Sequence, residues 1–169
     1  MAKTIDGKQK VKDALKGTYN IIKNLNNDVL RLFLIRKLNE KGIIEENNIN
    51  NNFETYLADI FRSVRFGSAH SQGNAAVIAF NYYIEKGAIT RSDKGIYKVD
   101  FDKMKQANEE LAQKVILIQG DGDILAAKNL IKKYGKIKPE LEKDLLKIRK
   151  AKIPVDIIFE EGKSVLGLE

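Results

Sequence analysis

The apolar residues of this chain recur at two different spacings, and the longest stretch shows the spacing of a helix. Between residues 9 and 41 they stand three and four positions apart, which places them on one helix face. Asn24, Asn26 and Asn27 are poor helix formers, so a bend in this helix is expected near them. Gly42 is a natural stop. The apolar stripe consists of Val11, Leu15, Tyr19, Ile22, Leu25, Val29, Leu32 and Ile35.

The polar tract of residues 45–52 predicts a loop, and two helices should follow it. The first covers residues 53–66 and turns Phe53, Leu57, Ile60, Phe61 and Val64 inward. Gly67 ends it, and Ser68 is the expected N-cap of a helix that contains His70. That second helix carries an apolar run from Ala75 to Ile84, broken only by Asn81. Because apolar residues cover nearly every side, the pattern predicts a buried central helix.

Small residues surround His70, the single histidine of the chain. They would let another backbone, or a ligand, come close to this point. They are Gly67, Ser68, Ala69, Ser71 and Gly73.

After residue 87 the pattern changes to that of a short β-hairpin. Residues 88–90 and 95–99 flank the polar segment 91–94. Asp100 or Asp102 should then cap a helix that runs to about Gln119. The inward face of this helix is formed by Met104, Ala107, Leu111, Val115 and Ile118.

The segment Gly120–Asp123 has the composition of a calcium loop, but the further oxygen ligands and the closing glutamate of an EF-hand are missing. It is interpreted as a turn in which Asp121 or Asp123 caps a helix that ends at Gly135. Pro139 should start another helix, to about Ala151, before an extended segment at residues 155–159. The predicted fold is mainly α: a single domain, 1–169, of about six helices and one short β-hairpin.

Composition narrows the class of protein. A chain of 169 residues fits one domain with a core of its own. The absence of cysteine excludes disulfides and thiolate metal sites. The first residues hold no apolar stretch of the signal-peptide kind, and the longest apolar run is about half of what a bilayer requires. We therefore expect a cytoplasmic protein with no membrane partner.

The net charge of +7 comes from lysines that concentrate near the two ends of the chain. Such patches can bind nucleic acid. Here the later lysines alternate with Glu140, Glu142 and Asp144, arginines are few, and no aromatic residues are interleaved. Lysine-rich helix faces of this kind are usually solvated surface, so a nucleic-acid partner is not expected.

The chemistry that the residues can support is limited. One histidine excludes an HExxH zinc motif, and no nucleophile elbow, P-loop or dinucleotide fingerprint is present. Two interpretations of His70 remain open on the residues alone. It is either a hydrogen-bonded side chain of the core, which composition favours, or a cleft residue.

Several segments carry a resemblance to a known family. In order they are FRSVRFG, AHSQGN, AFNYYIEKGAI, YKVDFDKM, QGDGD and KIPVDIIFEEG. Together they resemble the C-terminal part of the catalytic lobe of the dipeptidyl peptidase III family of zinc peptidases, in its bacterial form. The resemblance spans about Ile60 to Gly162, and a looser match runs back to about Asp6.

The resemblance implies that zinc is not a cofactor of this chain. In the family, an HExxGH helix supplies two zinc ligands and the general base, and that motif is not in this sequence. A second helix supplies the third ligand from a Glu-Glu-x-x-x-(Asp or Glu) pattern. Lys23 and Asn24 stand at the two glutamate positions here, and only Asp28 keeps the pattern. A cationic amine and a neutral amide cannot replace a carboxylate ligand.

The resemblance also assigns one site residue, and positions near it in the sequence add further candidates. His70 matches the family histidine that stabilises the carbonyl oxygen of the scissile bond, a role we expect to be vestigial here. Asn74, one helical turn along, and Arg65 are the candidate substrate-binding residues, with Arg62 beside them. The alternative for the arginines is an ordinary surface ion pair.

The sequence is therefore consistent with two functions. The first is a truncated zinc metallopeptidase-like protein without peptidase activity on its own, whose family ligand is a peptide. The second is a helical interaction module that binds a partner chain or an acidic surface. Its docking faces would be the apolar sides of the first helix and of the His70 helix. The expected partner is a second copy or a chain that supplies the missing lobe.

Overall fold

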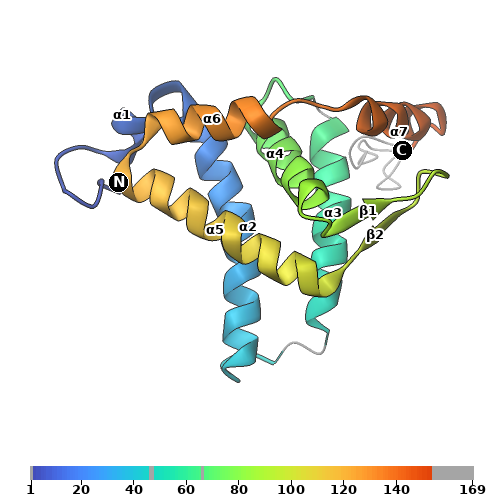
Figure 1. Ribbon diagram of the computed structural model, residues 1–169, viewed down its shortest axis with the longest axis horizontal. Helices are drawn as coiled ribbons and strands as arrows, with labels where there is room; N and C mark the ends of the chain where they lie inside the picture. The colour runs from blue at the N-terminus through green and yellow to red at the C-terminus, as the bar shows by residue number, and fades with distance from the viewer. Residues whose placement is uncertain (1, 46–47, 66, 154–169) are drawn as a thin grey trace, which may run out of the picture.

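The computed structural model describes residues 2–45, 48–65 and 67–153. Within these ranges the chain is mainly α with one two-stranded hairpin, so the predicted fold class is confirmed (Figure 1). The elements are α1 (Val11–Leu15), η1 (Lys16–Thr18), α2 (Tyr19–Glu40), α3 (Ile49–Arg65), α4 (Ser71–Glu85), β1 (Ile89–Arg91), β2 (Tyr97–Val99), α5 (Phe101–Asp121), α6 (Ile124–Tyr134) and α7 (Pro139–Lys150).

Two predicted boundaries in the first half are wrong. The long first helix is interrupted by η1 and not at the asparagines, because Lys16 has a positive φ of 48° that no α-helix accommodates. The loop predicted for residues 45–52 extends too far, because α3 already begins at Ile49. Asn48 explains this early start: its side-chain Oδ1 accepts from the backbone N–H of Asn50 at 3.2 Å, as a capping residue does.

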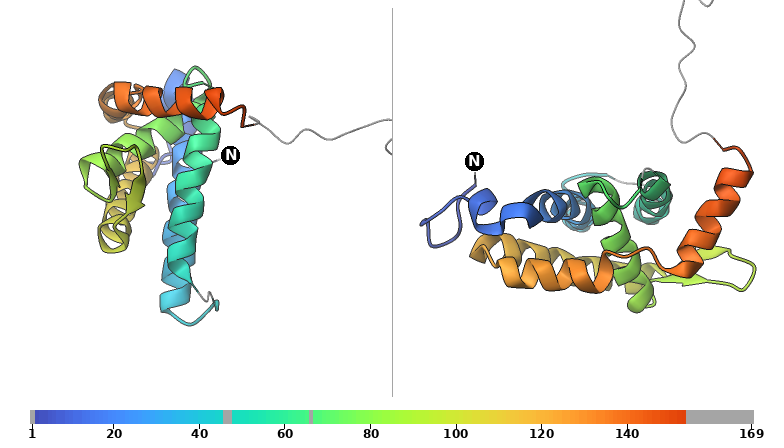
Figure 2. Two further views of the ribbon diagram at one scale, coloured as in Figure 1. Left: turned by 90° about the vertical axis from the view of Figure 1, so that its right-hand side faces the viewer. Right: turned by 90° about the horizontal axis from the view of Figure 1, so that it is seen from above.

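Helix α4 is the centre of the molecule. It contacts α2, α3, α5, α6 and β1, and its residues from Ala75 to Tyr83 are all buried. Figure 2 shows it between the α2–α3 side and the α5–α6 side. The prediction of a buried central helix is confirmed.

Two asparagines of α4 hold the end of α6. The Asn81 side-chain amide donates to the carbonyls of Tyr134 at 2.7 Å and Lys136 at 2.8 Å. The Asn74 amide donates to the Gly135 carbonyl at 3.1 Å and to the Ser68 carbonyl at 3.3 Å. Carbonyls at a helix C-terminus lack partners within their own helix, and α4 supplies those partners.

The two helix caps predicted in the second half are confirmed. The Asp100 side chain accepts from the Lys103 N–H at the start of α5, and Asp123 accepts from the N–H groups of Leu125 and Ala126 at the start of α6. Gly122, with a φ of 66°, supplies the left-handed residue that ends α5.

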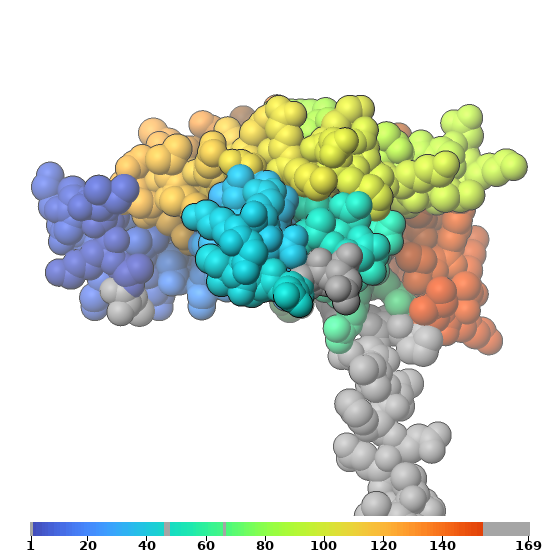
Figure 3. All heavy atoms as spheres, turned by 90° about the horizontal axis from the view of Figure 1, so that it is seen from below, coloured from blue at the N-terminus to red at the C-terminus, as the bar shows by residue number. Residues whose placement is uncertain are grey.

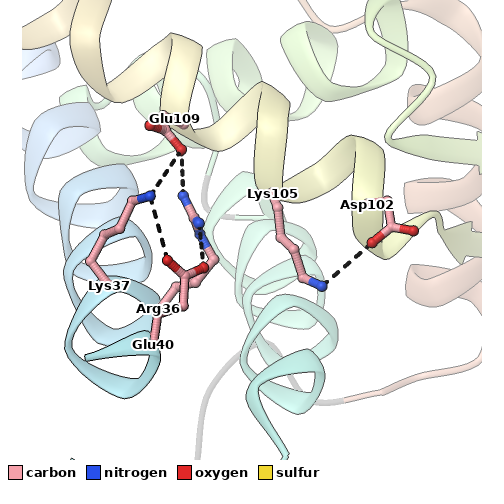
Figure 4. Close-up of polar contacts among 6 residues, drawn as sticks. All are labelled: Arg36, Lys37, Glu40, Asp102, Lys105 and Glu109. Carbon is pink, nitrogen blue, oxygen red and sulfur yellow. Dashed lines mark hydrogen bonds and ion pairs between the residues drawn. The ribbon is translucent and has the colours of Figure 1, made fainter. Parts of the chain in front are cut away.

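An ion-pair cluster joins α5 to α2 (Figure 4). Arg36 is only 6 % exposed, and its guanidinium contacts Glu40 and Glu109 at 2.6 Å each. Lys37 lies beside the same two carboxylates. The nearby Lys105–Asp102 pair is longer, at 3.5 Å, and its aspartate is exposed. Exposed pairs of this kind contribute little to stability, so Arg36 is the stronger link between the two helices. Figure 3 shows α5 alongside the tips of α2 and α3.

The hairpin is attached to α7 through one buried carboxylate. Ile89 pairs with Val99, and Arg91 with Tyr97. Asp144 of α7 is 6 % exposed and accepts from Arg91 Nε at 2.6 Å, from Arg91 Nη2 at 3.0 Å and from the Tyr97 hydroxyl at 2.9 Å. The predicted helix start at Pro139 is confirmed. The extended segment predicted at residues 155–159 lies outside the described residues.

No helix in the described part of the chain is both long enough and apolar enough to cross a bilayer.

Candidate functional site

A pocket of about 390 Å³ opens where α2, α3 and the beginning of α4 meet. Its floor consists of buried residues, and its rim carries charged side chains of both signs. The lining residues are Asp28, Arg31, Tyr56, Asp59, Ile60, Arg62, Ser63, His70, Gln72, Gly73 and Ala76.

His70 lies on this pocket and is exposed, so the interpretation of His70 as a core histidine is wrong. The predicted helix start is also wrong: α4 begins at Ser71, and His70, not Ser68, is the N-cap residue. The His70 backbone is extended, with φ −84° and ψ 147°, which places the imidazole outside the helical core.

Gly73 explains why the segment before His70 leaves the helix. A Cβ at position 73 would lie 2.2 Å from the Gly67 carbonyl oxygen, so the loop backbone packs directly on the first turn of α4. Gly67 itself has a φ of 95°, which favours glycine. The small residues around His70 thus admit another backbone, as their pattern predicts.

Two hydrogen bonds join α2 to the start of α4 beside His70. The Gln72 amide donates to Asp28 Oδ2 at 3.0 Å, and the Asn24 amide donates to Ser71 Oγ at 3.1 Å. Burial raises the pKa of Asp28 above its ordinary value, while the Gln72 bond and the Arg31 charge oppose the rise. Asp28 and Asn24, two positions of the family pattern, therefore face the His70 segment.

Tyr56 forms part of the pocket floor. It is 4 % exposed, and its ring packs edge-on against Tyr83 with centroids 6.3 Å apart. Its hydroxyl has no hydrogen-bond partner among the described residues. Burial raises the pKa of Tyr56 well above 10.0, and the nearby Tyr83 hydroxyl and the carboxylates of Asp28 and Asp59 add to the rise. An unpaired buried hydroxyl is costly and points to a ligand or water.

Asn74 and Arg65 are not among the residues that line this pocket. Asn74 uses its amide on the carbonyls of Ser68 and Gly135. Arg65 donates to the Ile153 carbonyl and lines a separate pocket of about 300 Å³ between α3 and α7. Of the two arginines named from the sequence, Arg62 lies at the His70 pocket, and Arg31 of α2 lines the same pocket.

The donor set does not fit zinc. Among the residues that the structure describes, no three His, Cys, Asp or Glu side chains are placed where they could hold a metal ion together. Lys23 is exposed, and the Asn24 amide is bonded to Ser71.

Sequence reasoning missed Tyr56, Asp59 and Gln72. A signal was present for the first two, because Tyr56, Asp59 and Ser63 recur at helical spacing on one face of α3. Gln72 could be found only once the start of α4 is known.

Comparison with known proteins now identifies the class. The fold is similar to dipeptidyl peptidase III of Caldithrix abyssi (TM-score 0.81, 36% identity, 90% of this chain and 29% of that one). It is also similar to dipeptidyl-peptidase III of Corallococcus sp. strain EGB (TM-score 0.84, 31% identity, 92% of this chain and 29% of that one). The chain thus has the fold of a dipeptidyl peptidase III segment, and the resemblance seen in the sequence is confirmed.

One curated relative is a plant protein, "Nudix hydrolase 3" of Arabidopsis thaliana. It is 33% identical over 147 residues, which cover 87% of this chain and 19% of the relative. No family model matches the chain. The chain spans less than a third of the length of each of these proteins.

Proposed function

We propose that this chain is a dipeptidyl peptidase III-like protein that binds peptide at the His70 pocket but does not hydrolyse it on its own. The observation that carries the proposal is which residues occupy the zinc-ligand positions of the family pattern. Lys23 and Asn24 stand where the resemblance places two glutamates, and the Asn24 amide is bonded to Ser71 at 3.1 Å.

His70 is the residue we assign to the peptide. An imidazole N–H at the pocket rim can donate to a peptide carbonyl, and in a complete peptidase that donor would stabilise the oxygen as it becomes negative. Without an activated water there is no attack for it to assist. The donor therefore contributes to binding here, and the catalytic role is vestigial.

Asn74 and Arg65 enter the proposal in positioning roles. The Asn74 amide holds the Ser68 carbonyl, two residues before His70, and so orients the loop. Arg65, the last residue of α3, donates to the Ile153 carbonyl. Asn74 thus supports the peptide site from outside it, whereas Arg65 ties the end of α3 to the residues after α7.

A dipeptidyl-arylamide assay with added zinc tests the proposal. We expect no release of the arylamine above the buffer rate, because an amine and an amide stand at the two glutamate positions from which the family takes its third zinc ligand. Clear hydrolysis that is abolished both by a chelator and by His70→Ala would overturn it.

The second candidate function is an interaction module that binds a second copy of the chain. Leu117 of α5 and Leu125 of α6 favour it, being 58% and 69% exposed. The apolar sides of α4, by contrast, are covered by this chain, so they offer no docking face. Light scattering at high protein concentration tests this alternative: a strict monomer counts against it, and a dimer lost in Leu117→Gln supports it.

A further inference from the structure

A groove of about 770 Å³ lies between α5 and α6, and the C-terminal part of α4 lines it as well. The two helices diverge from the turn at Gly122, as Figure 1 shows. Apolar side chains of both helices, Leu117, Ile118 and Leu130, line the groove among polar ones. It shares no lining residue with the His70 pocket and is therefore a separate surface.

Large apolar side chains are exposed beside this groove. Ile116 and Leu117 are neighbours in the second half of α5, and both are exposed. Ile5 is exposed as well, and it lies over Gly120, one helical turn after Ile116. Leu125 is exposed at the start of α6. Four of the nine large apolar side chains that are exposed in the described part of the chain thus belong to this region, which is typical of a protein–protein contact surface.

The charged side chains of the groove differ in whether they have partners. Most are used within the chain: the ion pairs are Glu85–Lys133 at 2.9 Å and Lys86–Glu110 at 2.5 Å, and Asp123 caps α6. Lys114 and Asp121 are exposed and form no ion pair among the described residues. They have opposite charges and stand seven positions apart on α5, about two turns. They therefore share one face of the helix, with Leu117 between them.

We propose that this surface binds a second copy of the chain, with the two α5 helices antiparallel about a two-fold axis beside Leu117. Lys114 of each copy then faces Asp121 of the partner subunit, and the two Leu117 side chains pack on each other. The inference rests on the second candidate function, which it deepens by naming the contact and its geometry.

The order of the charges favours a second copy over a partner of one charge. An acidic partner would attract Lys114 and repel Asp121, and a basic partner would do the reverse. A two-fold axis places a surface against itself in reverse order, so a cation at one end and an anion at the other become complementary. Exposed ion pairs contribute little affinity, so they set the register of the two helices, and the apolar side chains supply the affinity.

Sedimentation equilibrium on the full chain tests the inference. We expect a monomer–dimer equilibrium in which Lys114→Glu and Asp121→Lys each raise the dissociation constant about tenfold, because each places like charges together at two contacts. Asp102→Lys is the matched control. It changes the net charge as Asp121→Lys does, on the same helix but outside the groove, and should leave the dissociation constant unchanged.

Mixing the two charge variants separates a pairing effect from a folding defect. Each variant alone repels its own copy, whereas a mixed dimer has opposite charges at both contacts. We therefore expect the mixture to dimerise about as tightly as the wild type. The chain contains no cysteine, so an introduced thiol gives a direct readout. A short bismaleimide should link Leu117→Cys to its own copy but not Asp102→Cys, which the antiparallel arrangement keeps far from its symmetry mate.

The outcomes separate this inference from the second candidate function. If Leu117→Gln abolishes the dimer but both charge variants match the wild type, binding of a second copy stands and the antiparallel contact is wrong. A mixture that dimerises more tightly than the wild type would indicate parallel helices and also contradict the inference. If the chain is a monomer at every concentration, both proposals fail and the groove takes a different chain.

Discussion

Gly73 determines both the packing at the start of α4 and the geometry of the His70 pocket. It lines the pocket, and the absence of its side chain lets the Gly67 carbonyl approach the first turn of α4. That approach sets where the helix begins and leaves His70 at the rim. The sequence pattern predicted a close approach but not which backbone makes it, because Gly67 and Gly73 meet only after the chain has turned.

We predict that the single substitution Gly73→Ala lowers the free energy of unfolding by about 1–3 kcal/mol, the usual cost of overpacking. The new methyl would stand 2.2 Å from the Gly67 oxygen. Urea denaturation followed by circular dichroism measures the effect. Gly17→Ala is the matched control, because nothing lies within 4 Å of that position, and it should be neutral or slightly stabilising. Equal stability of the two variants would contradict the packing argument.

Elements with strong helical periodicity were predicted well, and their junctions less well. The caps at Asp100 and Asp123 could be predicted from the sequence because a helix cap depends on only three or four neighbouring residues. The break at Lys16 could not be predicted, since a lysine with positive φ carries no sequence signal. The attachment of the hairpin to α7 depends on Arg91 and Asp144, 53 positions apart, which no local pattern relates.

The contact between the hairpin and α7 should depend on pH. Arg91 donates two hydrogen bonds to Asp144 and holds the pKa of that carboxyl well below its ordinary value, against the opposing effect of burial. A depressed folded-state pKa means that the contribution to stability is complete above about pH 4, the unfolded value, and is lost as the pH falls below it.

We therefore expect Asp144→Asn to be about 2 kcal/mol less stable than the wild type at pH 7. The difference should shrink as the pH falls from 4 towards 2. Urea denaturation at pH 7, 4 and 2.5 checks both points, and the exposed Asp102→Asn serves as control. A wild-type-to-variant difference that does not change with pH would mean that the carboxylate does not stabilise the contact.

For the whole molecule, the important property is that the helices share one hydrophobic core. Buried apolar residues from α1 to α7 form one cluster, and α4 lies at its centre. The sequence predicted much of this core, since periodicity marks inward faces, but it missed Tyr56 and placed Leu57 and Phe61, which are only partly buried, in the core. It could not predict the pocket, which requires three helices to be placed against one another. The resemblance located only His70 and Asp28 there.

A shared core predicts a single cooperative unfolding transition, as expected of one domain. The chain has six tyrosines and no tryptophan, so tyrosine fluorescence can be compared with circular dichroism in the same urea titration. The two curves should coincide, with a slope of about 1–3 kcal/mol per molar urea. Two separated transitions would show that the chain contains more than one folding unit.

The two asparagines of α4 restrict insertions and deletions within this helix. Asn74 and Asn81 stand seven positions apart, about two turns, and together they hold the three successive carbonyls of residues 134–136. One residue inserted between them would rotate one amide by about 100° away from its carbonyl. Residues 75–80 should therefore accept neither insertion nor deletion, so that any gap among related sequences falls outside this interval.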